Sequence, residues 1–521
     1  MRLNYPSIFN DVIGPVMRGP SSSHCAASIR IGKLARDLME GDIDEVLVEF
    51  DPEGSLATTH ESQGSDTGLF GGFLGWDPDD ERLLDAAKAI IDAGIKVNFK
   101  LSEYGAKHPN TYKLTLKNAS ETHEMVALST GGGMIEVIEI DHIPLSIAGD
   151  YFETLVFIAS EEQEMLGWVE GRTDADEINL CMGKHINLIE IKAQSFLSDE
   201  ICSELNSRRG VSSTKKLSPV LPVLSRKNME VPFITCEEML QYNEGRNLEL
   251  WELAMHYESV RGNIPKQEVF EKMKRIVRIL HRSILKGIEG TSFENRILGY
   301  QSGSFKTQME KKNLLDGGLL NQIVLYVTAM MEVKSSMGVI VAAPTAGACG
   351  VLPGASLGTA TALSLPEDEV TKGMLAAGMI GVFIAAHSTF AAEVGGCQAE
   401  CGAGSGMAAA ALVTLARGHT RQAVAAASMA LQNVLGMVCD PVANRVEVPC
   451  LGKNVLAASN ALSCANMALA DFDPVIPLDE VIETMDKVGK SIPSELRCTA
   501  LGGLSITNTS KEIEKRLRSQ E

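Results

Sequence analysis

The chain has 521 residues, of which 45% are apolar, and it carries a formal net charge of −20. This length predicts several domains, each with enough apolar residues to bury a core of its own. The strong negative charge argues against nucleic acids and anionic membranes as partners, because both select basic surfaces.

Residues 1–145 alternate strand and helix patterns, which predicts an α/β domain. An amphipathic helix is expected at 81–95, and strands are expected at 45–51, 96–101, 112–117 and 135–141. The three glycines at 131–133 require either unusual backbone angles or a close approach of another group, both of which glycine permits.

Residues 146–222 predict a smaller ferredoxin-like (ACT-type) α+β module, with one strand of the βαββαβ pattern left unresolved. A stretch with two prolines, 217–228, is the expected linker. Helical patterns dominate residues 230–521, and their Ala-rich segments predict closely packed helices in an all-α C-terminal domain.

The 11 cysteines are an odd number, and the first residues lack a signal-peptide pattern. We therefore expect a cytoplasmic protein with reduced thiols. Two apolar stretches, 335–366 and 373–386, have the character of membrane spans. Prolines and glycines interrupt the first and the second is short, so both are predicted to be buried core and no membrane partner is expected.

A Gly-Pro turn leads into Ser21, Ser22, Ser23 and His24, and a helix pattern follows. Hydroxyls and backbone N–H groups at a helix start bind carboxylates or phosphates, and His24 could donate to the anion or move a proton. Helix capping by the serines, beside a solvated histidine, accounts for the same residues equally well.

Four cysteines are spaced as C-x3-C (Cys397, Cys401) and C-x10-C (Cys439, Cys450). Zinc sites favour CxxC pairs, whereas iron–sulfur clusters accept varied spacing. Three thiolate ligands would leave one iron open to act as a Lewis acid. The alternative is that these cysteines are small buried hydrophobic residues.

Two further stretches are candidates for ligand binding. The uncharged segment 343–354 is rich in Gly and Pro, so the backbone of Thr345, Ala346 and Gly347 could approach a ligand closely, or the segment could be a break between buried helices. A strand is expected directly after His108, Pro109 and Asn110. These residues could form a turn, or His108 could be a second histidine that contacts the ligand.

Together these motifs resemble the bacterial iron–sulfur L-serine dehydratases over nearly the whole chain. Residues 1–145 are similar to the family's beta domain through IGPVMRGPSSSH, HPNTYK and STGGGMIE, and 146–222 are similar to its ACT-type module. Residues 230–521 are similar to its alpha domain through APTAGACG, GGCQAE and CDPVANRVEVPC. This order implies the two-chain form fused into one polypeptide.

The resemblance implies elimination of water from L-serine to give pyruvate and ammonia, with a [4Fe–4S] cluster and no pyridoxal phosphate. It implies a homodimer and assigns three cluster ligands, which leave the fourth iron open: Cys397, Cys439 and Cys450. The residues then expected at the substrate are Ser21, Ser22, Ser23, Asn110, Thr345, Ala346 and Gly347. The expected catalytic histidines are His24, His60, His108 and His387.

Several positions depart from the family pattern. Gln63 stands where the family has a histidine proposed for proton transfer, and His60 is the candidate substitute. The segment 387–393 introduces His387 and Glu393 near the first expected ligand, and Cys401 replaces an apolar residue.

These departures leave two alternatives to serine dehydration open. One is the same chemistry on a different β-hydroxy or β-substituted amino acid, and the weaker one is a non-catalytic ligand-binding or regulatory homologue. The turn 161–164 also departs from the usual ACT pattern. Dimerisation is therefore expected of that module in preference to amino-acid binding.

Overall fold

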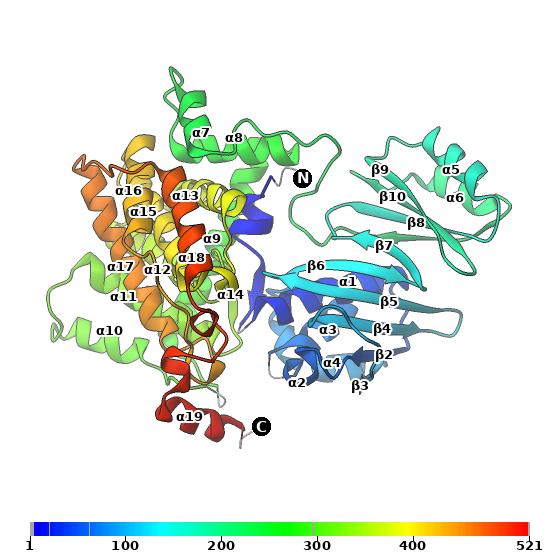
Figure 1. Ribbon diagram of the computed structural model, residues 1–521, viewed down its shortest axis with the longest axis horizontal. Helices are drawn as coiled ribbons and strands as arrows, with labels where there is room; N and C mark the ends of the chain where they lie inside the picture. The colour runs from blue at the N-terminus through cyan, green and yellow to red at the C-terminus, as the bar shows by residue number, and fades with distance from the viewer. Residues whose placement is uncertain (1–4, 20, 62, 294–295, 519–521) are drawn as a thin grey trace. The chain divides into compact units, whose positions relative to one another are not determined.

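The computed structural model of the chain (Figure 1) describes residues 5–19, 21–61, 63–293 and 296–518. It divides into two compact units, which are described separately. The sheet unit comprises Ser21–Met229, and the helical unit comprises Met1–Pro20 together with Glu230–Glu521.

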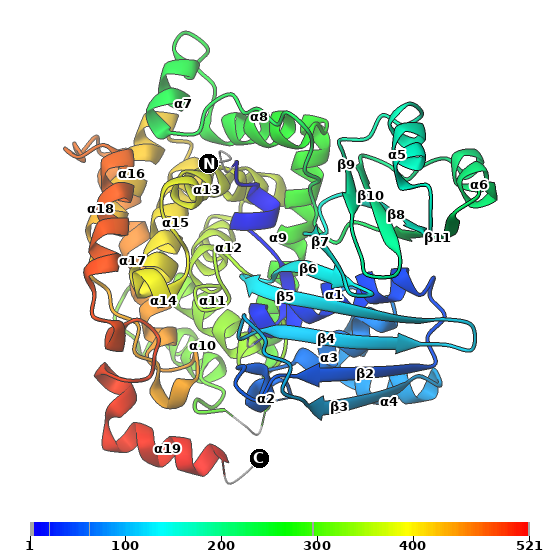
Figure 2. The same ribbon diagram turned by 45° about the vertical axis from the view of Figure 1, so that its right-hand side comes forward.

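A six-stranded sheet forms the larger part of the sheet unit, in the order β3-β2-β4-β5-β6-β7. Only β2 and β3 run parallel. Helices α1 (Ala27–Leu38) and α3 (Ser65–Phe73) cover one face, with α4 (Ala86–Asp92) beside them (Figure 2). The strands are β2 (Glu45–Phe50), β3 (Lys96–Leu101), β4 (Thr111–Lys117), β5 (Thr122–Gly131), β6 (Met134–Ile140) and β7 (Ile143–Ile147).

Two strands of this sheet, β5 and β7, are absent from the sequence prediction. The helix expected at 81–95 is also shorter, because a 3-10 turn capped by Asp80 (Glu81–Asp85) precedes α4. Gly131, Gly132 and Gly133 have φ angles of 110°, 59° and 82° between β5 and β6, so the expectation of unusual backbone angles is confirmed.

A four-stranded sheet completes the sheet unit, in the order β11-β8-β10-β9. Its elements in chain order are β8 (Phe152–Ile158), α5 (Glu162–Glu170), β9 (Glu177–Cys181), β10 (Asn187–Ala193), α6 (Asp199–Ser207) and β11 (Val211–Leu217). Both helices pack on one face, where Val156, Ile158 and Ile189 are buried. On the other face Leu155, Phe157 and Leu188 join the core of the six-stranded sheet. The strand of the βαββαβ pattern that the sequence left unassigned is β9.

The N-terminal residues belong to the helical unit, which differs from the predicted domain of residues 1–145. The carboxylate of buried Glu258 accepts hydrogen bonds from the Ser7 hydroxyl and, at 2.8 Å, from the Ile8 N–H. In addition, β1 (Val16–Arg18) pairs antiparallel with β12 (Val339–Val341). A pattern of local hydrophobicity does not reveal such long-range partners.

Closely packed helices form the remainder of the helical unit. The Ala-rich helix α15 lies among α12, α13, α16 and α17, and almost all of its residues are buried. The helices are α7 (Cys236–Asn243), α8 (Leu250–Gly262), α9 (Lys266–Glu289), α10 (Ser302–Glu310), α11 (Leu319–Lys334), α12 (Val351–Leu363), α13 (Glu367–His387), α14 (Ala392–Gly395), α15 (Ala403–Leu415), α16 (Thr420–Gln432), α17 (Cys450–Leu469), α18 (Leu478–Ser491) and α19 (Asn508–Arg518).

Helix α13 is long and apolar enough to cross a membrane, judged by length and composition. However, 78% of its most apolar window is buried inside the structure. This is the environment that a core helix requires.

Ionisable side chains interrupt the otherwise apolar layer between the two sheets. Glu153 of β8 is only 1% exposed, and Lys192 of β10 lies 3.7 Å from it. Neither carboxylate oxygen of Glu153 has a hydrogen-bond partner among the described residues. Burial raises the pKa of Glu153 to about 9, so this side chain is neutral at pH 7.

We expect this burial to make stability depend on pH. Because the folded-state pKa lies above the unfolded value, the unfolded chain loses the proton first and stability falls as pH rises between the two values. Glu153→Gln removes this loss. The melting temperature of this variant should exceed that of the wild type. The difference should grow by several degrees from about pH 5 to about pH 8, because a free-energy difference of about 1 kcal/mol shifts the melting temperature of a domain of this size by about 2–4 °C.

Calorimetry at several pH values measures this margin. Glu177→Gln is the matched control, because Glu177 lies on the neighbouring strand β9 and is less deeply buried. Its melting temperature should depend on pH as that of the wild type does. A margin for Glu153→Gln that stays constant with pH would contradict the expectation.

Candidate active site

Four of the buried thiols of the helical unit are called here the thiol cluster: Cys397, Cys401, Cys439 and Cys450. Cys397 directly precedes the π-helical turn η4 (Gln398–Gly402), which contains Cys401 and continues into α15. Cys450 is the first residue of α17. Their exposed fractions are 2%, 1%, 4% and 6% in chain order, so none of them is a surface thiol.

Hydrogen bonds connect three of these thiols. The sulfur of Cys397 accepts from Cys401 and Cys439, and these two bonds hold the pKa of the Cys397 thiol well below its usual range. Its neighbours therefore favour ionisation of Cys397, and the thiolate is the form that binds metals. Burial acts in the opposite direction at Cys450 and raises its pKa to about 12.

A further thiol, Cys498, contacts the thiol of Cys439. The backbone brings it there, because the Cys439 N–H donates to Leu496 O and the Cys498 N–H donates to Cys439 O, both at 2.8 Å. The sequence patterns do not single out Cys498, since its contact with Cys439 spans a loop and a helix pair.

Two lysines lie near the thiol cluster, and burial lowers the pKa of one of them, Lys334. The Lys453 ammonium lies 2.8 Å from Asp440 Oδ1 and 2.6 Å from Val438 O. Burial lowers the pKa of Lys453, but Asp440 and the neighbouring sulfurs outweigh it and the net shift is upward. Lys334 is 1% exposed, donates to Val446 O, and interacts electrostatically with Cys450.

Asn454 connects the thiol cluster to the segment that contains Gly347. This side chain is fully buried, and its Nδ2 donates to Gly347 O and Cys450 O, both at 2.8 Å, and to Cys401 Sγ at 3.5 Å. Its Oδ1 accepts from the Gly350 N–H at 3.1 Å. One amide therefore fixes the start of α17 against the loop before α12.

Glu400, which the sequence analysis did not select, faces the same loop. Thr345 Oγ1 donates to Glu400 Oε1 at 2.6 Å. A Cβ atom at Gly347 would lie 2.8 Å from the same oxygen, so only glycine fits there. Removal from water, with the added charge of Cys397, raises the pKa of Glu400 to about 8. This side chain therefore carries a proton at neutral pH.

In the sheet unit, a chain of hydrogen bonds joins several predicted residues. His24 Nδ1 lies 2.9 Å from Ser21 Oγ, and His24 Nε2 lies 3.0 Å from Thr59 Oγ1. Thr59 donates to Ser55 O at 2.6 Å, and the Ser55 hydroxyl contacts Asn110. Burial lowers the pKa of His24 to about 4, so the ring is neutral at pH 7. The side chains of Ser22 and Ser23 lie outside the described part of the structure.

His60 lies next to this chain and has a partner of its own. Its Nδ1 is 2.7 Å from Asp66 Oδ1, and its ring packs against the rings of Phe50 and Phe99. The hydrogen bond to Asp66 raises the pKa of His60. A histidine paired in this way is oriented for proton transfer, as expected of a substitute for the residue missing at Gln63.

The other two predicted histidines have different roles in the structure. His108 Nδ1 accepts from the Asn110 N–H at 3.1 Å, which supports the turn reading. His387 ends α13 with an exposed ring whose Nε2 contacts Ile234 O at 3.1 Å, so it is not part of the buried thiol cluster. Glu393, the other group expected near the first ligand, acts electrostatically on Glu400. The catalytic role of His387 stays a prediction.

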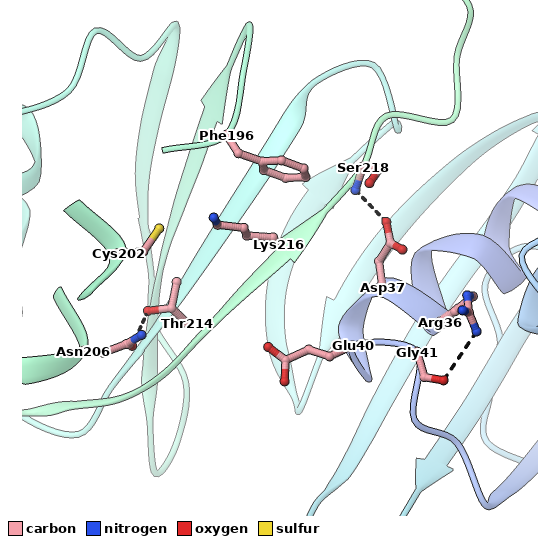
Figure 3. Close-up of a pocket in the computed structure, with 10 residues that line it drawn as sticks. All are labelled: Arg36, Asp37, Glu40, Gly41, Phe196, Cys202, Asn206, Thr214, Lys216 and Ser218. Atoms are coloured by element: carbon pink, nitrogen blue, oxygen red, sulfur yellow. Dashed lines mark hydrogen bonds between the residues drawn. The ribbon is translucent and has the colours of Figure 1, made fainter. Parts of the chain in front are cut away.

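A cavity of about 440 Å³ lies within the sheet unit between the end of α1 and the β11–α6 edge (Figure 3). Its polar groups are largely paired with one another, since the Ser218 N–H donates to Asp37 at 2.7 Å and Thr214 donates to Asn206 at 2.8 Å. The residues drawn there include none of the predicted site residues. We therefore place the candidate active site at the thiol cluster.

Known proteins match the segment of the chain that contains the thiol cluster. The serine dehydratase alpha chain family matches residues 245–505, which include the whole thiol cluster. A probable L-serine dehydratase alpha chain of Bacillus subtilis is 35% identical over 285 residues, covering 55% of this chain and 95% of the relative. The L-serine dehydratase alpha chain of Peptoniphilus asaccharolyticus is 34% identical over 54% of this chain and 97% of its own.

A longer relative covers both units. An L-serine dehydratase of Helicobacter pylori is 27% identical over 507 residues, which cover 94% of this chain and 96% of the relative. The match to an alpha chain and the match to a full-length polypeptide confirm the resemblance drawn from the motifs. This chain belongs to the L-serine dehydratase family, in the form that carries both parts in one polypeptide.

Proposed function

We propose that this chain eliminates water from L-serine to give pyruvate and ammonia, and that it does so with a [4Fe–4S] cluster bound by Cys397, Cys439 and Cys450. The family membership supports the reaction. The single observation that carries the cofactor is the buried thiol cluster, in which Cys397 is held as a thiolate by two neighbouring thiols.

The donor set fits a polynuclear cluster better than a single ion. Among the described residues, no three His, Cys, Asp or Glu side chains converge as one metal ion requires. The cysteines of an iron–sulfur cluster bind different irons and need no common point. When bound, a cluster with three protein ligands supplies an open iron that polarises the substrate hydroxyl.

The surrounding residues have roles that follow from their contacts. Lys453, whose pKa is raised, can balance the charge of thiolates in a buried site, where an unpaired charge is costly. Asn454 holds the loop at Gly347 and the start of α17 in one arrangement. Polar groups that are already held in place do not have to reorient during the reaction, which lowers its energetic cost.

The elimination needs one group to remove the α-proton and one to protonate the departing hydroxyl. Glu400 suits the second role, because a carboxyl group with a pKa of about 8 holds a proton at neutral pH and lies against Thr345 of the expected substrate loop. In the sheet unit, His24, whose ring is neutral, and the His60–Asp66 pair stay the predicted proton-transfer groups.

Anaerobic purification followed by iron and sulfide analysis tests the proposal directly. We expect about four irons and four sulfides per chain, and release of ammonia and pyruvate from L-serine faster than from other β-hydroxy or β-substituted amino acids. Cys450→Ser should lose the cluster. Cys464→Ser, which changes another buried thiol of α17, should retain it.

Two results would count against parts of this proposal. Failure to bind iron after anaerobic reconstitution would refute the cofactor and favour a binding or regulatory role. An intact cluster with a better substrate than serine would instead show that the substrate has changed, as the departures at Gln63 and 387–393 allow.

The role of Glu400 is tested by Glu400→Gln, which keeps the size of the side chain and its contact with Thr345 but cannot transfer a proton. We expect kcat for L-serine to fall by about 10²-fold or more, with the iron content unchanged. Glu393→Gln, at an exposed neighbour, is the control and should change kcat by no more than about threefold. Wild-type turnover by Glu400→Gln would exclude Glu400 from proton transfer.

A further inference from the structure

His24 of the sheet unit has a hydroxyl partner at each of its two ring nitrogens. We infer that Thr59 is a positioning residue that fixes the tautomer of His24, with the ring proton on Nε2 and a bare Nδ1 that accepts from the Ser21 hydroxyl. The kinetic side of this inference rests on the proposed function, because it concerns a histidine expected to act in catalysis. The position of the proton is a property of the sheet unit alone.

The hydroxyl proton of Thr59 already has an acceptor. Thr59 Oγ1 lies 2.6 Å from Ser55 O, and a carbonyl oxygen can only accept a hydrogen bond. A contact this short therefore requires that Thr59 donates to Ser55. The bond joins a threonine to the carbonyl four residues earlier, which is a common arrangement in helices, and the short helix α2 (Leu56–Thr59) keeps the two groups in register.

The hydrogen bond between Thr59 and His24 then has only one possible direction. His24 Nε2 lies 3.0 Å from Thr59 Oγ1, and a hydroxyl whose proton points to a carbonyl offers only lone pairs to the ring. Nε2 must therefore carry a proton. Burial lowers the pKa of His24 to about 4, so the ring holds a single proton at pH 7 and Nδ1 is bare.

The proton of Ser21 is assigned by the same reasoning. Ser21 Oγ lies 2.9 Å from His24 Nδ1, and a bare ring nitrogen can only accept a hydrogen bond. The Ser21 hydroxyl therefore donates to His24, and its oxygen keeps only lone pairs for other partners. A ligand group that meets this oxygen has to be a donor, such as an ammonium or a hydroxyl, and a carboxylate has to be bound by other groups.

The hydroxyl of Thr59 is needed because either ring nitrogen of a neutral histidine can carry the proton, and the neighbouring groups decide which one does. His24 is only 8% exposed, so water does not readily replace a lost partner. Without the Thr59 oxygen, the Nε2–H group would lose its acceptor inside the protein, and a buried donor without an acceptor costs free energy. The preference for this tautomer would then weaken, and Nδ1 would be available to Ser21 for only part of the time.

Nuclear magnetic resonance of the full-length, anaerobically purified chain, labelled with ¹⁵N-histidine, locates the proton at pH 7. His24→Gln identifies the His24 signals among those of the 10 histidines. We expect a protonated Nε2 and an unprotonated Nδ1. The Nε2 proton should be visible, because burial and the hydrogen bond to Thr59 slow its exchange with water.

Thr59→Val and Thr59→Ser separate the hydroxyl from the shape of the side chain. Valine has the shape of threonine but no acceptor, so the Nε2 proton signal should weaken or disappear. The kcat for L-serine should fall about tenfold or more, because His24 is no longer held in one tautomer. Thr59→Ser keeps the hydroxyl and should restore both the signal and kcat.

Thr58→Val is the matched control, because Thr58 is the adjacent threonine and its side chain is exposed. This variant should match the wild type in both the spectrum and kcat. A loss of the His24 signal in Thr58→Val equal to that in Thr59→Val would show that any change in α2 disturbs the ring, and it would overturn the inference.

Three further results would overturn it. A proton on Nδ1 of His24 in the wild type would reverse both hydrogen bonds, and this spectrum decides the point even if Thr59→Val does not fold. A signal that Thr59→Val leaves unchanged would remove Thr59 from any role in holding the proton. Equal losses of kcat in Thr59→Val and Thr59→Ser would indicate packing alone. If the wild type does not convert L-serine, the proposed function fails, whereas the spectra still decide where the proton lies.

Discussion

A thiolate buried inside a helical unit is the constraint around which the candidate site is built. A negative charge away from water must be paired or accept hydrogen bonds, and otherwise it is neutralised. The thiols of Cys401 and Cys439 and the Lys453 ammonium lower the pKa of Cys397. Cys401 lies in the turn that follows Cys397, whereas Cys439 and Lys453 come from other segments, so the site forms only when those segments are assembled.

The helices around the thiol cluster allow this assembly because their contact residues are small. Almost every residue of α15 is buried, and the Ser405 hydroxyl donates to Ala457 O of α17 at 2.7 Å, a contact that large side chains would prevent. Gln398, also fully buried, donates to Met485 O of α18 at 2.7 Å and accepts from the Gly436 N–H at 2.8 Å. The turn that carries Cys397 is therefore tied to the segment that leads to Cys439.

The sheet unit holds its polar residues by a different principle. His24 is buried and neutral, and hydroxyl groups occupy both ring nitrogens. His60 is instead kept basic by Asp66 and enclosed by aromatic rings. The two environments therefore move the pKa values of the two histidines in opposite directions. Neither property could be assigned without knowing which residues lie beside each ring.

The sequence by itself determined the family and indicated the candidate cluster cysteines, because motifs and hydrophobic periodicity are local properties. It could not identify Glu400 as a protonated side chain, place His387 at the surface, or assign residues 5–19 to the helical unit. Nor did it show that Cys401 and Cys498 contact the expected ligands. These results depend on burial and on partners distant along the chain, and only the tertiary structure decides which charges are removed from water and which groups then face them.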